Sequence, residues 1–371
     1  SYFMTVPNHI LDKFPKLSSE HLLENLNLPV GKNKIILDTD TANEIDDQFA
    51  LAWALLSSDK IDLLGVTAEP YSFQHHKDEL LEAYDIISNN KKIDKSNEEL
   101  IASYDSWVNG LIESKTHPND IYFDTPEEGV EKSYQEIITI FNKLNLPHDG
   151  KVFRGSSQYL DSFDQPIETE SSKFIVNTCL KYPDEKIYVV AIGCVTNIAS
   201  ALLMKPEIIK NIVIVWTSGF PTYSFNHNKN SLNLVQDVKS SQLLFECGVA
   251  NVYLPGFNVG AQLTLSLPDM EKFIKGKGDI GNYLFELYTN NPLHKQRGVL
   301  DHTWRTWVIW DVINIAWLIN PSWVPSTIIP ASVLNDDLYW EKSKKSHFIR
   351  EAFGVNRDEI FYDFYKKLDK L

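Results

Sequence analysis

The sequence has few cysteines and no long apolar run. Cys179, Cys194 and Cys247 are its three cysteines among 371 residues, and their spacing is not that of metal ligands. Each lies in an apolar setting, so we expect reduced core thiols, which are typical of a reducing compartment. The chain shows no signal-peptide-like apolar segment near its start and no apolar stretch long enough to span a bilayer. These absences argue against a membrane as partner and predict a cytoplasmic protein.

Positive charge is also scarce. The chain has 35 Lys and Arg against 50 Asp and Glu, which gives a formal charge of −15 and a pI near 5.1. Such a balance argues against a nucleic-acid polymer or an anionic membrane as partner, because both repel an acidic protein. It is compatible with a small neutral or cationic ligand. The Gly-rich loops that cradle phosphates are absent, which argues against a phosphotransferase.

Short apolar runs alternate with amphipathic segments along most of the chain. The runs predict strands at 35–37, 61–68, 151–155, 186–192, 211–217 and 251–254. Strands that alternate with helices predict an α/β fold, with a parallel sheet covered by helices on both faces. We expect residues 1–33 to form an N-terminal arm and residues 34–371 a single domain. Within it, about 74–146 contains three predicted helices and no strand, which indicates a helical insertion or cap.

The segment from Lys34 to Leu56 holds a dense group of acids. A strand-like run, 35–37, leads into four aspartates, and an apolar run with helical spacing follows; the aspartates are Asp38, Asp40, Asp46 and Asp47. Ligands of open α/β sheets bind where strands end and helices begin. A hard cation such as Ca²⁺, which takes about 6–8 oxygen ligands, explains why like charges gather there. The alternative is an acidic surface turn with a capping aspartate.

A second acid lies in an unusual place. The segment 306–319 is apolar almost all round, which predicts a buried helix with Asp311 inside it. A buried carboxylate without a partner costs several kcal/mol, so Asp311 needs compensation. Either an arginine such as Arg305 or Arg297, or the cation proposed near Asp40 and Asp47, could provide it.

Four motifs, taken together, resemble the calcium-dependent nucleoside hydrolases of the inosine–uridine type. In chain order they are DTD…DDQFAL after the first strand, GCVTNIASAL, SLNLVQD and WDVINIAWLINPSW, and they cover roughly residues 34–325. The resemblance implies a Rossmann-like α/β domain with a mixed, mostly parallel sheet. It also implies a homodimer or homotetramer that cleaves the N-glycosidic bond of a nucleoside or another small ribosyl compound.

The resemblance assigns a role to each motif residue. Asp40, Asp47 and Asp311 would bind Ca²⁺ through carboxylates, and Ile192 through its backbone carbonyl. Asp46 resembles the general base that takes a proton from a metal-bound water. The remaining candidates lie around the substrate: Asp38, which resembles the acid that steadies the site, Asn233, which resembles the asparagine that binds ribose hydroxyls, Asn43 and Trp310.

The chain also departs from the family pattern. The acidic loop is two residues longer, so that Asn43 or Glu44 could reach a ligand or could lie on the surface. A glutamate of many members is Ser231 here, an asparagine expected after the second strand is not evident, and the histidine that helps protonate the departing base is Trp310. Trp310 could stack on the leaving group or could simply fill the core. His75 or His76 is a substitute acid to consider, although surface histidines are commoner.

These departures leave two hypotheses. The first is a hydrolase whose metal and ribose site is kept and whose base site is rebuilt. The second is a non-catalytic or differently specific protein that binds a ribosyl ligand on the same fold. Retention of Asp46 beside the metal ligands favours catalysis, whereas the changes at Ser231 and Trp310 favour an altered ligand.

Overall fold

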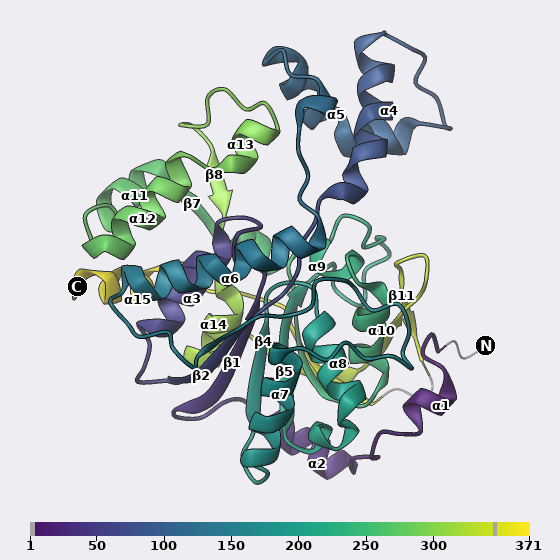
Figure 1. The fold of residues 1–371 in the computed structure, drawn as a ribbon, viewed down its shortest axis with the longest axis vertical. Coiled ribbons are helices and arrows are strands. Elements are labelled where there is room, and N and C mark those ends of the chain that lie inside the picture. The colour runs from purple at the N-terminus through teal and green to yellow at the C-terminus, as the bar shows by residue number, and fades with distance from the viewer. Residues whose placement is uncertain (1–3, 344–346) are drawn as a thin grey trace.

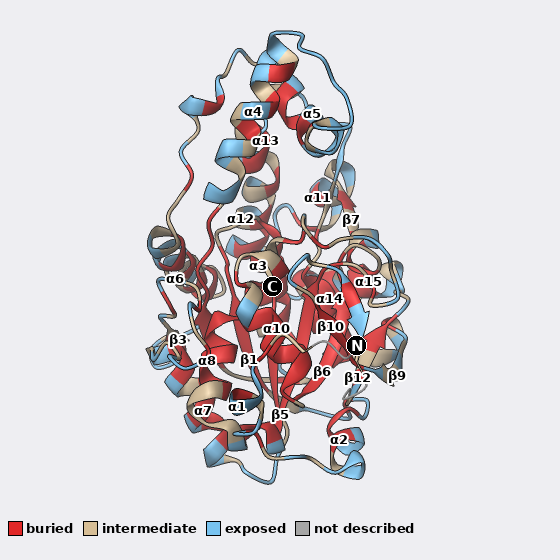
Figure 2. Ribbon diagram, turned by 90° about the vertical axis from the view of Figure 1, so that its right-hand side faces the viewer, coloured by how far each residue is buried: buried red, intermediate tan, exposed pale blue. Residues whose placement is uncertain are grey.

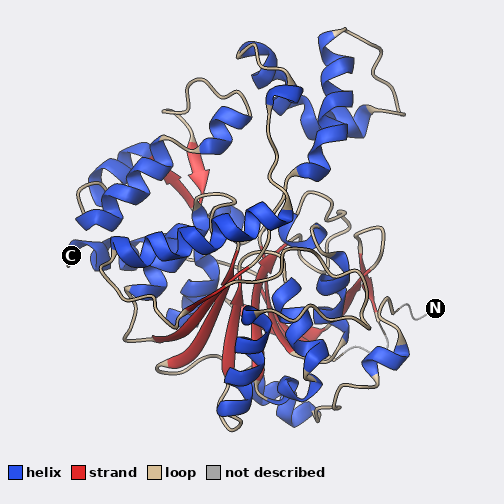
Figure 3. Ribbon diagram, viewed as in Figure 1, coloured by secondary structure: helices blue, strands red, loops and turns tan. Residues whose placement is uncertain are grey.

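The computed structural model describes residues 4–343 and 347–371, and its centre is an eight-stranded sheet (Figures 1 and 3). The strand order is β3-β2-β1-β4-β5-β6-β12-β9, in which β9 is antiparallel to β12 and the other pairs are parallel. The bounds are β1 Asn33–Thr39, β2 Ile61–Ala68, β3 Val152–Phe153, β4 Ile187–Ala191, β5 Ile212–Ser218, β6 Ala250–Pro255, β9 Ser326–Pro330 and β12 Phe348–Ala352. This architecture confirms the expected α/β fold with a mixed, mostly parallel sheet.

The sheet has its topological switch point between β1 and β4. From β1 the chain adds β2 and β3 on one side and then returns to add β4, β5 and β6 on the other. In register, Asp38 of β1 is aligned with Thr67 of β2 and Ala191 of β4. The carboxyl ends of parallel strands therefore meet there, where ligands of such sheets bind.

Helices cover both faces of the sheet, and each face has its own hydrophobic core (Figure 2). Core residues of α3 (Asp46–Leu55), α6 (Pro126–Lys143), α12 (Gly278–Thr289), α14 (Val312–Ile319) and α15 (Arg357–Asp369) belong to the first core. Those of α7 (Glu170–Lys181), α8 (Thr196–Met204) and α10 (Val238–Glu246) belong to the second. Strand side chains alternate between the two cores because successive residues of a strand face opposite ways.

Smaller elements complete the chain. Two further sheets have two strands each, β7 (Thr264–Ser266) with β8 (Thr306–Val308) and β10 (Ser332–Leu334) with β11 (Trp340–Lys342). The remaining helices are α1 Asn8–Leu11, α2 Ser19–Asn25, α9 Leu232–Val235, α11 Leu267–Phe273, α13 Pro292–Gln296, and the 3₁₀ helices η1 Gln74–His76, η2 Pro118–Asp120, η3 Pro206–Lys210, η4 Gly260–Gln262 and η5 Pro321–Trp323. None of the described helices is long and apolar enough to cross a membrane.

The N-terminal arm packs on the domain from residue 4 onwards; residues 1–3 lie outside the described part. Ile10 of α1 is buried in the second core and Leu22 of α2 in the first. The backbone N–H groups of Thr5 and Val6 donate to the Glu246 carboxylate, at 2.7 and 3.0 Å. These hydrogen bonds fix the arm to the end of α10.

The predicted helical block at 74–146 has two parts. One part, α6, packs against α3 and β2 at the sheet. The other consists of α4 (Lys77–Ser88) and α5 (Glu98–Glu113), which pack on each other around a small core of their own. Figure 1 shows this α4–α5 hairpin beyond the end of the sheet, with α13 on one side of it. The hairpin thus lies above the edge where the strands end.

The hairpin is joined to the chain after α13 by a close backbone contact. A Cβ added to Gly110 of α5 would lie 2.2 Å from the Arg297 carbonyl oxygen, and one added to Gly298 would lie 2.2 Å from the Gly110 carbonyl oxygen. Gly298 also has a φ of +70°, which L side chains rarely adopt. Glycine is required at both positions because the two backbones touch.

Gly110→Ala should therefore destabilise the protein although alanine is the better helix former. Overpacking of this kind typically costs about 1–3 kcal/mol, more than the roughly 1 kcal/mol that alanine gains in a helix. Thermal unfolding followed by circular dichroism measures the change, with the exposed Ser106→Ala on the same helix as control. A melting temperature of Gly110→Ala at or above that of the control would contradict this reading.

Candidate active site

The four aspartates of the acidic segment converge at the carboxyl end of β1. Asp38 is in β1, Asp40 follows the strand, and Asp46 and Asp47 form the first turn of α3; all four are buried. The sequence favours this turn because the apolar face of α3 packs in the first core, while two acids at a helix N-terminus are stabilised by the helix dipole. A cavity of about 440 Å³ opens there, and Asp40, Asp46 and Asp47 line it.

Asp311 joins this group from the far end of the chain. Asp46, Asp47 and Asp311 each offer a carboxylate oxygen, and these oxygens lie within 4.8 Å of one another. Asp40 lines the same cavity and contacts Asp47. The structure therefore brings together all the carboxylates that the sequence proposed as metal ligands or base.

The prediction of one helix over 306–319 was wrong in its first half. Residues 306–308 are strand β8, paired antiparallel with β7, and α14 begins at Val312 with Asp311 as its N-cap. A short apolar run has no periodicity that distinguishes a strand from a helix. Its structure therefore depends on whether another strand pairs with it. As a consequence Asp311 lies at a helix start, facing the cavity, and not inside a helix.

An arginine does not compensate Asp311. None of the ion pairs within residues 4–343 and 347–371 includes Asp311; Arg305 lies over the Trp304 ring and Arg297 over the Trp107 ring. Burial raises the pKa of Asp311 well above its usual range, and the charges of Asp46 and Asp47 raise it further. Of the two partners that the sequence left open, the arginine is not supported.

The other acids of the cavity are perturbed in the same direction. The pKa of Asp40 is raised well above its usual range, mainly by burial and then by the charge of Asp47. The pKa of Asp46 is also raised well above its usual range, mainly by burial and then by the charges of Glu44 and Asp47. Buried carboxylates that repel each other and face a cavity fit a hard cation, which removes both penalties. Asp46 Oδ1, buried and without a hydrogen-bond partner, fits the same interpretation.

Neighbouring groups hold the carboxylates in place. Thr39 Oγ1 donates to Asp47 Oδ2 at 2.6 Å, and Asn43 Nδ2 donates to Asp40 Oδ2 at 3.1 Å. A Cβ on Gly193 would lie 3.0 Å from Asp40 Cγ, so glycine lets the loop after β4 approach the aspartate. Ile192, just before it, donates its N–H to the Asp38 carbonyl at 2.9 Å and lines the cavity.

Asp38 lies behind the cavity and does not line it. Its Oδ1 accepts hydrogen bonds from Thr67 Oγ1 at 2.6 Å and Asn197 Nδ2 at 3.2 Å, and burial raises its pKa to about 7. Glu69, which occupies the region of the missing family asparagine, accepts from the Asn197 N–H at 2.6 Å and from the Cys194 thiol. Asp38 thus links the end of β1 to β2 and to the start of α8.

Asn233 and Trp310 also line the cavity. Asn233 Nδ2 donates to the Thr217 carbonyl at 3.0 Å, and its carboxamide oxygen is left for a ligand. Trp310 packs edge-to-face against Phe257, with ring centroids 5.9 Å apart. Ser231, the departure noted in the sequence, accepts from the Gly219 N–H at 2.8 Å and so stabilises the loop after β5.

Phe257 lines the cavity and was not predicted to do so, whereas Glu44 and His76 were left as open candidates. Phe257 follows β6, and its place just after a strand end is a signal that could have found it. Glu44, His76 and Arg297 also line the cavity, whereas His75 does not. His76 Nδ1 lies 2.8 Å from Tyr104 Oη of the hairpin, and burial lowers the pKa of His76 to about 3. His76 is therefore neutral near pH 7.

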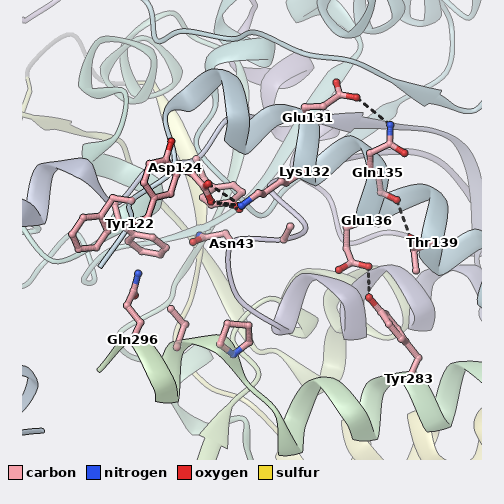
Figure 4. Close-up of a pocket in the computed structure, with 16 residues that line it drawn as sticks. Asn43, Tyr122, Asp124, Glu131, Lys132, Gln135, Glu136, Thr139, Tyr283 and Gln296 are labelled. Atoms are coloured by element: carbon pink, nitrogen blue, oxygen red, sulfur yellow. Dashed lines mark hydrogen bonds and ion pairs between the residues drawn. The ribbon is translucent and has the colours of Figure 1, made fainter. Parts of the chain in front are cut away.

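A second cavity, of about 610 Å³, adjoins the first (Figure 4). Asn43 and Phe73 line both cavities. In the second, Lys132 pairs with Asp124 at 2.8 Å and Tyr283 donates to Glu136 at 2.5 Å. These two carboxylates therefore have partners, in contrast to the Oδ1 of Asp46 in the first cavity.

Comparison with known proteins finds relatives among the nucleoside hydrolases. A probable uridine nucleosidase 2 of Arabidopsis thaliana is 32% identical over 142 residues, which is 37% of this chain and 43% of that protein. The pyrimidine-specific ribonucleoside hydrolase RihB of Escherichia coli is 27% identical over 296 residues, 78% of this chain and 79% of that protein.

Solved structures show the same fold at lower identity. A plant nucleoside hydrolase, PpNRh1, superposes with a TM-score of 0.60 at 16% identity, covering 91% of this chain and 98% of that one. A purine-preferring ribonucleoside hydrolase from Gardnerella vaginalis also gives 0.60, at 18% identity and the same coverage. The model of the inosine-uridine preferring nucleoside hydrolases matches residues 35–361. The chain therefore belongs to the inosine-uridine preferring nucleoside hydrolase family and is a hydrolase that acts on N-glycosyl compounds.

Proposed function

We propose that the chain hydrolyses the N-glycosidic bond of a ribonucleoside or a similar ribosyl compound, with Ca²⁺ as its cofactor. The observation that carries the proposal is the group of buried aspartates that face one cavity, none of which forms an ion pair with another described residue. Asp40, Asp47, Asp311 and the Ile192 carbonyl would hold the ion. All four are oxygen donors, the kind of ligand that Ca²⁺ prefers.

Each remaining residue has a role that follows from its place. A bound Ca²⁺ would supply Lewis acidity to a water molecule and to ribose hydroxyls. Asp46, with a free oxygen at the start of α3, takes the proton of the attacking water. The water oxygen bonds to the anomeric carbon while the C–N bond breaks, and the electron pair leaves with the base. Nearby carboxylates stabilise the oxocarbenium-like transition state.

The cavity residues other than the proposed Ca²⁺ ligands would position the substrate. Asn233 is placed to accept from ribose hydroxyls, and Asn43 to contact the ligand from the acidic loop, where its Oδ1 is buried without a partner. Trp310 provides a flat surface for the leaving group. Asp38 acts from behind, through the loop that holds Asp40.

The alternative, a protein that binds ribosyl ligands without cleaving them, makes a different prediction. Chromatography of uridine, cytidine, inosine and adenosine after incubation with the Ca²⁺-loaded protein separates the two. Release of free base and ribose in equal amounts supports hydrolysis. A raised melting temperature with a nucleoside, without any product, would favour the binding protein, since a ligand of the native state stabilises it.

Leaving-group chemistry gives a further prediction. Trp310 has one N–H donor and no acidic proton near neutral pH, and His76 is neutral there, so neither readily protonates a departing purine. We expect a p-nitrophenyl riboside, whose leaving group departs unaided, to have a higher kcat/KM than inosine by at least about 10-fold. Side-by-side kinetics decide it. Equal values would show that another residue protonates the base.

We also propose that the chain works in the cytoplasm as a homodimer or homotetramer. The resemblance to the family supports the assembly, and three free, buried cysteines are consistent with a reducing compartment. Light scattering of the purified chain tests the assembly. A monomer at micromolar concentration contradicts it.

A further inference from the structure

The second cavity contains more negative than positive side chains. Its lining includes the carboxylates of Asp124, Glu131 and Glu136 and the ammonium group of Lys132. Lys132 pairs with Asp124 at 2.8 Å, and Glu131 pairs with Arg154 at 2.9 Å. Within residues 4–343 and 347–371, no ion pair includes Glu136. The excess negative charge of this cavity therefore lies at Glu136.

Two hydrogen bonds orient the Glu136 carboxylate (Figure 4). Tyr283 of α12 donates to its Oε1 at 2.5 Å, and Gln48 of α3 donates to its Oε2 at 3.5 Å. A carboxylate has about four acceptor sites, so these two donors leave room for a ligand. Lys143 lies over the Tyr283 ring, 5.2 Å from its centroid, but it does not line the cavity and forms no ion pair with Glu136. Glu136 is thus a positioned, partly buried acceptor.

Aromatic side chains line the same cavity, namely those of Tyr71, Phe73, Tyr122, Phe123 and Tyr283. The face of an aromatic ring attracts a cation, and a carboxylate forms a charge-assisted hydrogen bond with a protonated amine. A protonated amine has three donors and no acceptor, which suits a carboxylate such as Glu136. The lining is therefore complementary to an organic cation with an apolar body.

The two cavities share part of their lining. Asn43 and Phe73 line both, and Asn43 Oδ1 is buried without a hydrogen-bond partner. The volumes, about 440 Å³ for the first cavity and about 610 Å³ for the second, both lie in the range of about 300–1,000 Å³ that is typical of ligand pockets. A ligand whose ribose occupies the first cavity can therefore extend into the second.

We propose that the second cavity binds the far end of the leaving group, and that this end is a protonated amine on an apolar or aromatic arm, with Glu136 as its partner. This inference rests on the proposed N-ribosyl hydrolysis and concerns its substrate class. The preferred substrate is then a ribosyl compound larger than an ordinary nucleoside, with a cationic group remote from the ribose.

The test compares adenosines that carry an aminoalkyl chain on the exocyclic amino group with adenosines that carry an alkyl chain of equal length. The pairs are aminoethyl with propyl, aminobutyl with pentyl and aminohexyl with heptyl, each assayed with Ca²⁺-loaded protein. At the length that reaches Glu136, kcat/KM should favour the amine by at least about 10-fold, the scale of a hydrogen bond between charged groups. Glu136→Gln should bring this ratio to within about 3-fold of one.

Glu127→Gln is the matched control, because Glu127 is an exposed acid of α6 that does not line the cavity. A chain with a formal charge of −15 attracts any cation to some degree, and both variants reduce that charge equally. Glu127→Gln should therefore keep the wild-type ratio. Wild-type ratios near one at every length, or a preference that survives Glu136→Gln, overturn the proposal while hydrolysis of nucleosides itself stands.

The melting temperature tests the cavity without turnover, since a ligand of the native state stabilises it. The aminoalkyl compound should raise the melting temperature of the wild type more than its alkyl counterpart does, and this difference should vanish in Glu136→Gln. Equal shifts in the wild type contradict the proposed cation site. A wild type that shows the difference but cleaves no ribosyl compound contradicts the proposed function and leaves the cation site in place.

Discussion

Asp46→Asn should lower kcat by at least about 100-fold, the usual scale for loss of a general base. Asn keeps the size and one acceptor of the side chain but cannot take a proton from water. Because Asp46 is assigned no bond to the cation, the metal content and KM should change little. Steady-state kinetics on uridine, together with metal analysis of each preparation, measure both quantities.

The control is Asp59→Asn, the same substitution at an exposed acid just beyond α3. It should behave as wild type. A loss of metal in Asp46→Asn as large as the loss of rate would reassign Asp46 as a ligand. That outcome would fit the geometry too, because carboxylate oxygens of Asp46, Asp47 and Asp311 lie within 4.8 Å of one another.

Asp311→Asn should weaken Ca²⁺ binding by more than about 100-fold. Loss of a residue that only hydrogen-bonds to a metal ligand typically costs about 10–100-fold in affinity, and Asp311 is proposed to be a ligand itself. The substitution removes a buried carboxylate that lies within 4.8 Å of the carboxylate oxygens of Asp46 and Asp47. Calorimetric titration of chelator-stripped protein with Ca²⁺ gives the affinity. Asp301→Asn, at an exposed acid ten residues earlier, is the matched control. Unchanged affinity in Asp311→Asn would show that its carboxylate is balanced in another way.

Much of the fold could be predicted because many of its strands and helices have recognisable local sequence patterns. The runs 61–68, 186–192 and 211–217 are apolar and β-branched, and they became β2, β4 and β5 with small changes of boundary. The stretch 306–311 was misread because its structure depends on β7, a partner forty residues away. The sequence also gave no sign that α4 and α5 pack on each other while α6 packs on the sheet.

The candidate site likewise has a part that could be predicted from the sequence and a part that could not. The acids of the β1–α3 loop are close in sequence, so a strand followed by a helix suffices to bring them together. Arg297, His76 and Phe257 reach the cavity only through the tertiary packing of α13, the hairpin and β6. Phe257 had a signal in its place just after a strand, but nothing local to His76 or Arg297 shows whether either lies on the surface or in the cavity, so the sequence could name His76 only as an alternative.

The most direct test of a cation-dependent N-ribosyl hydrolase is the rate of ribose release from uridine and inosine by chelator-stripped protein, before and after addition of Ca²⁺. The account predicts a negligible rate without metal and recovery at about one equivalent of Ca²⁺ per chain, since a cation bound at these carboxylates supplies the Lewis acid. A stripped protein that releases ribose at the full rate, or a Ca²⁺-loaded protein that releases none, would contradict it.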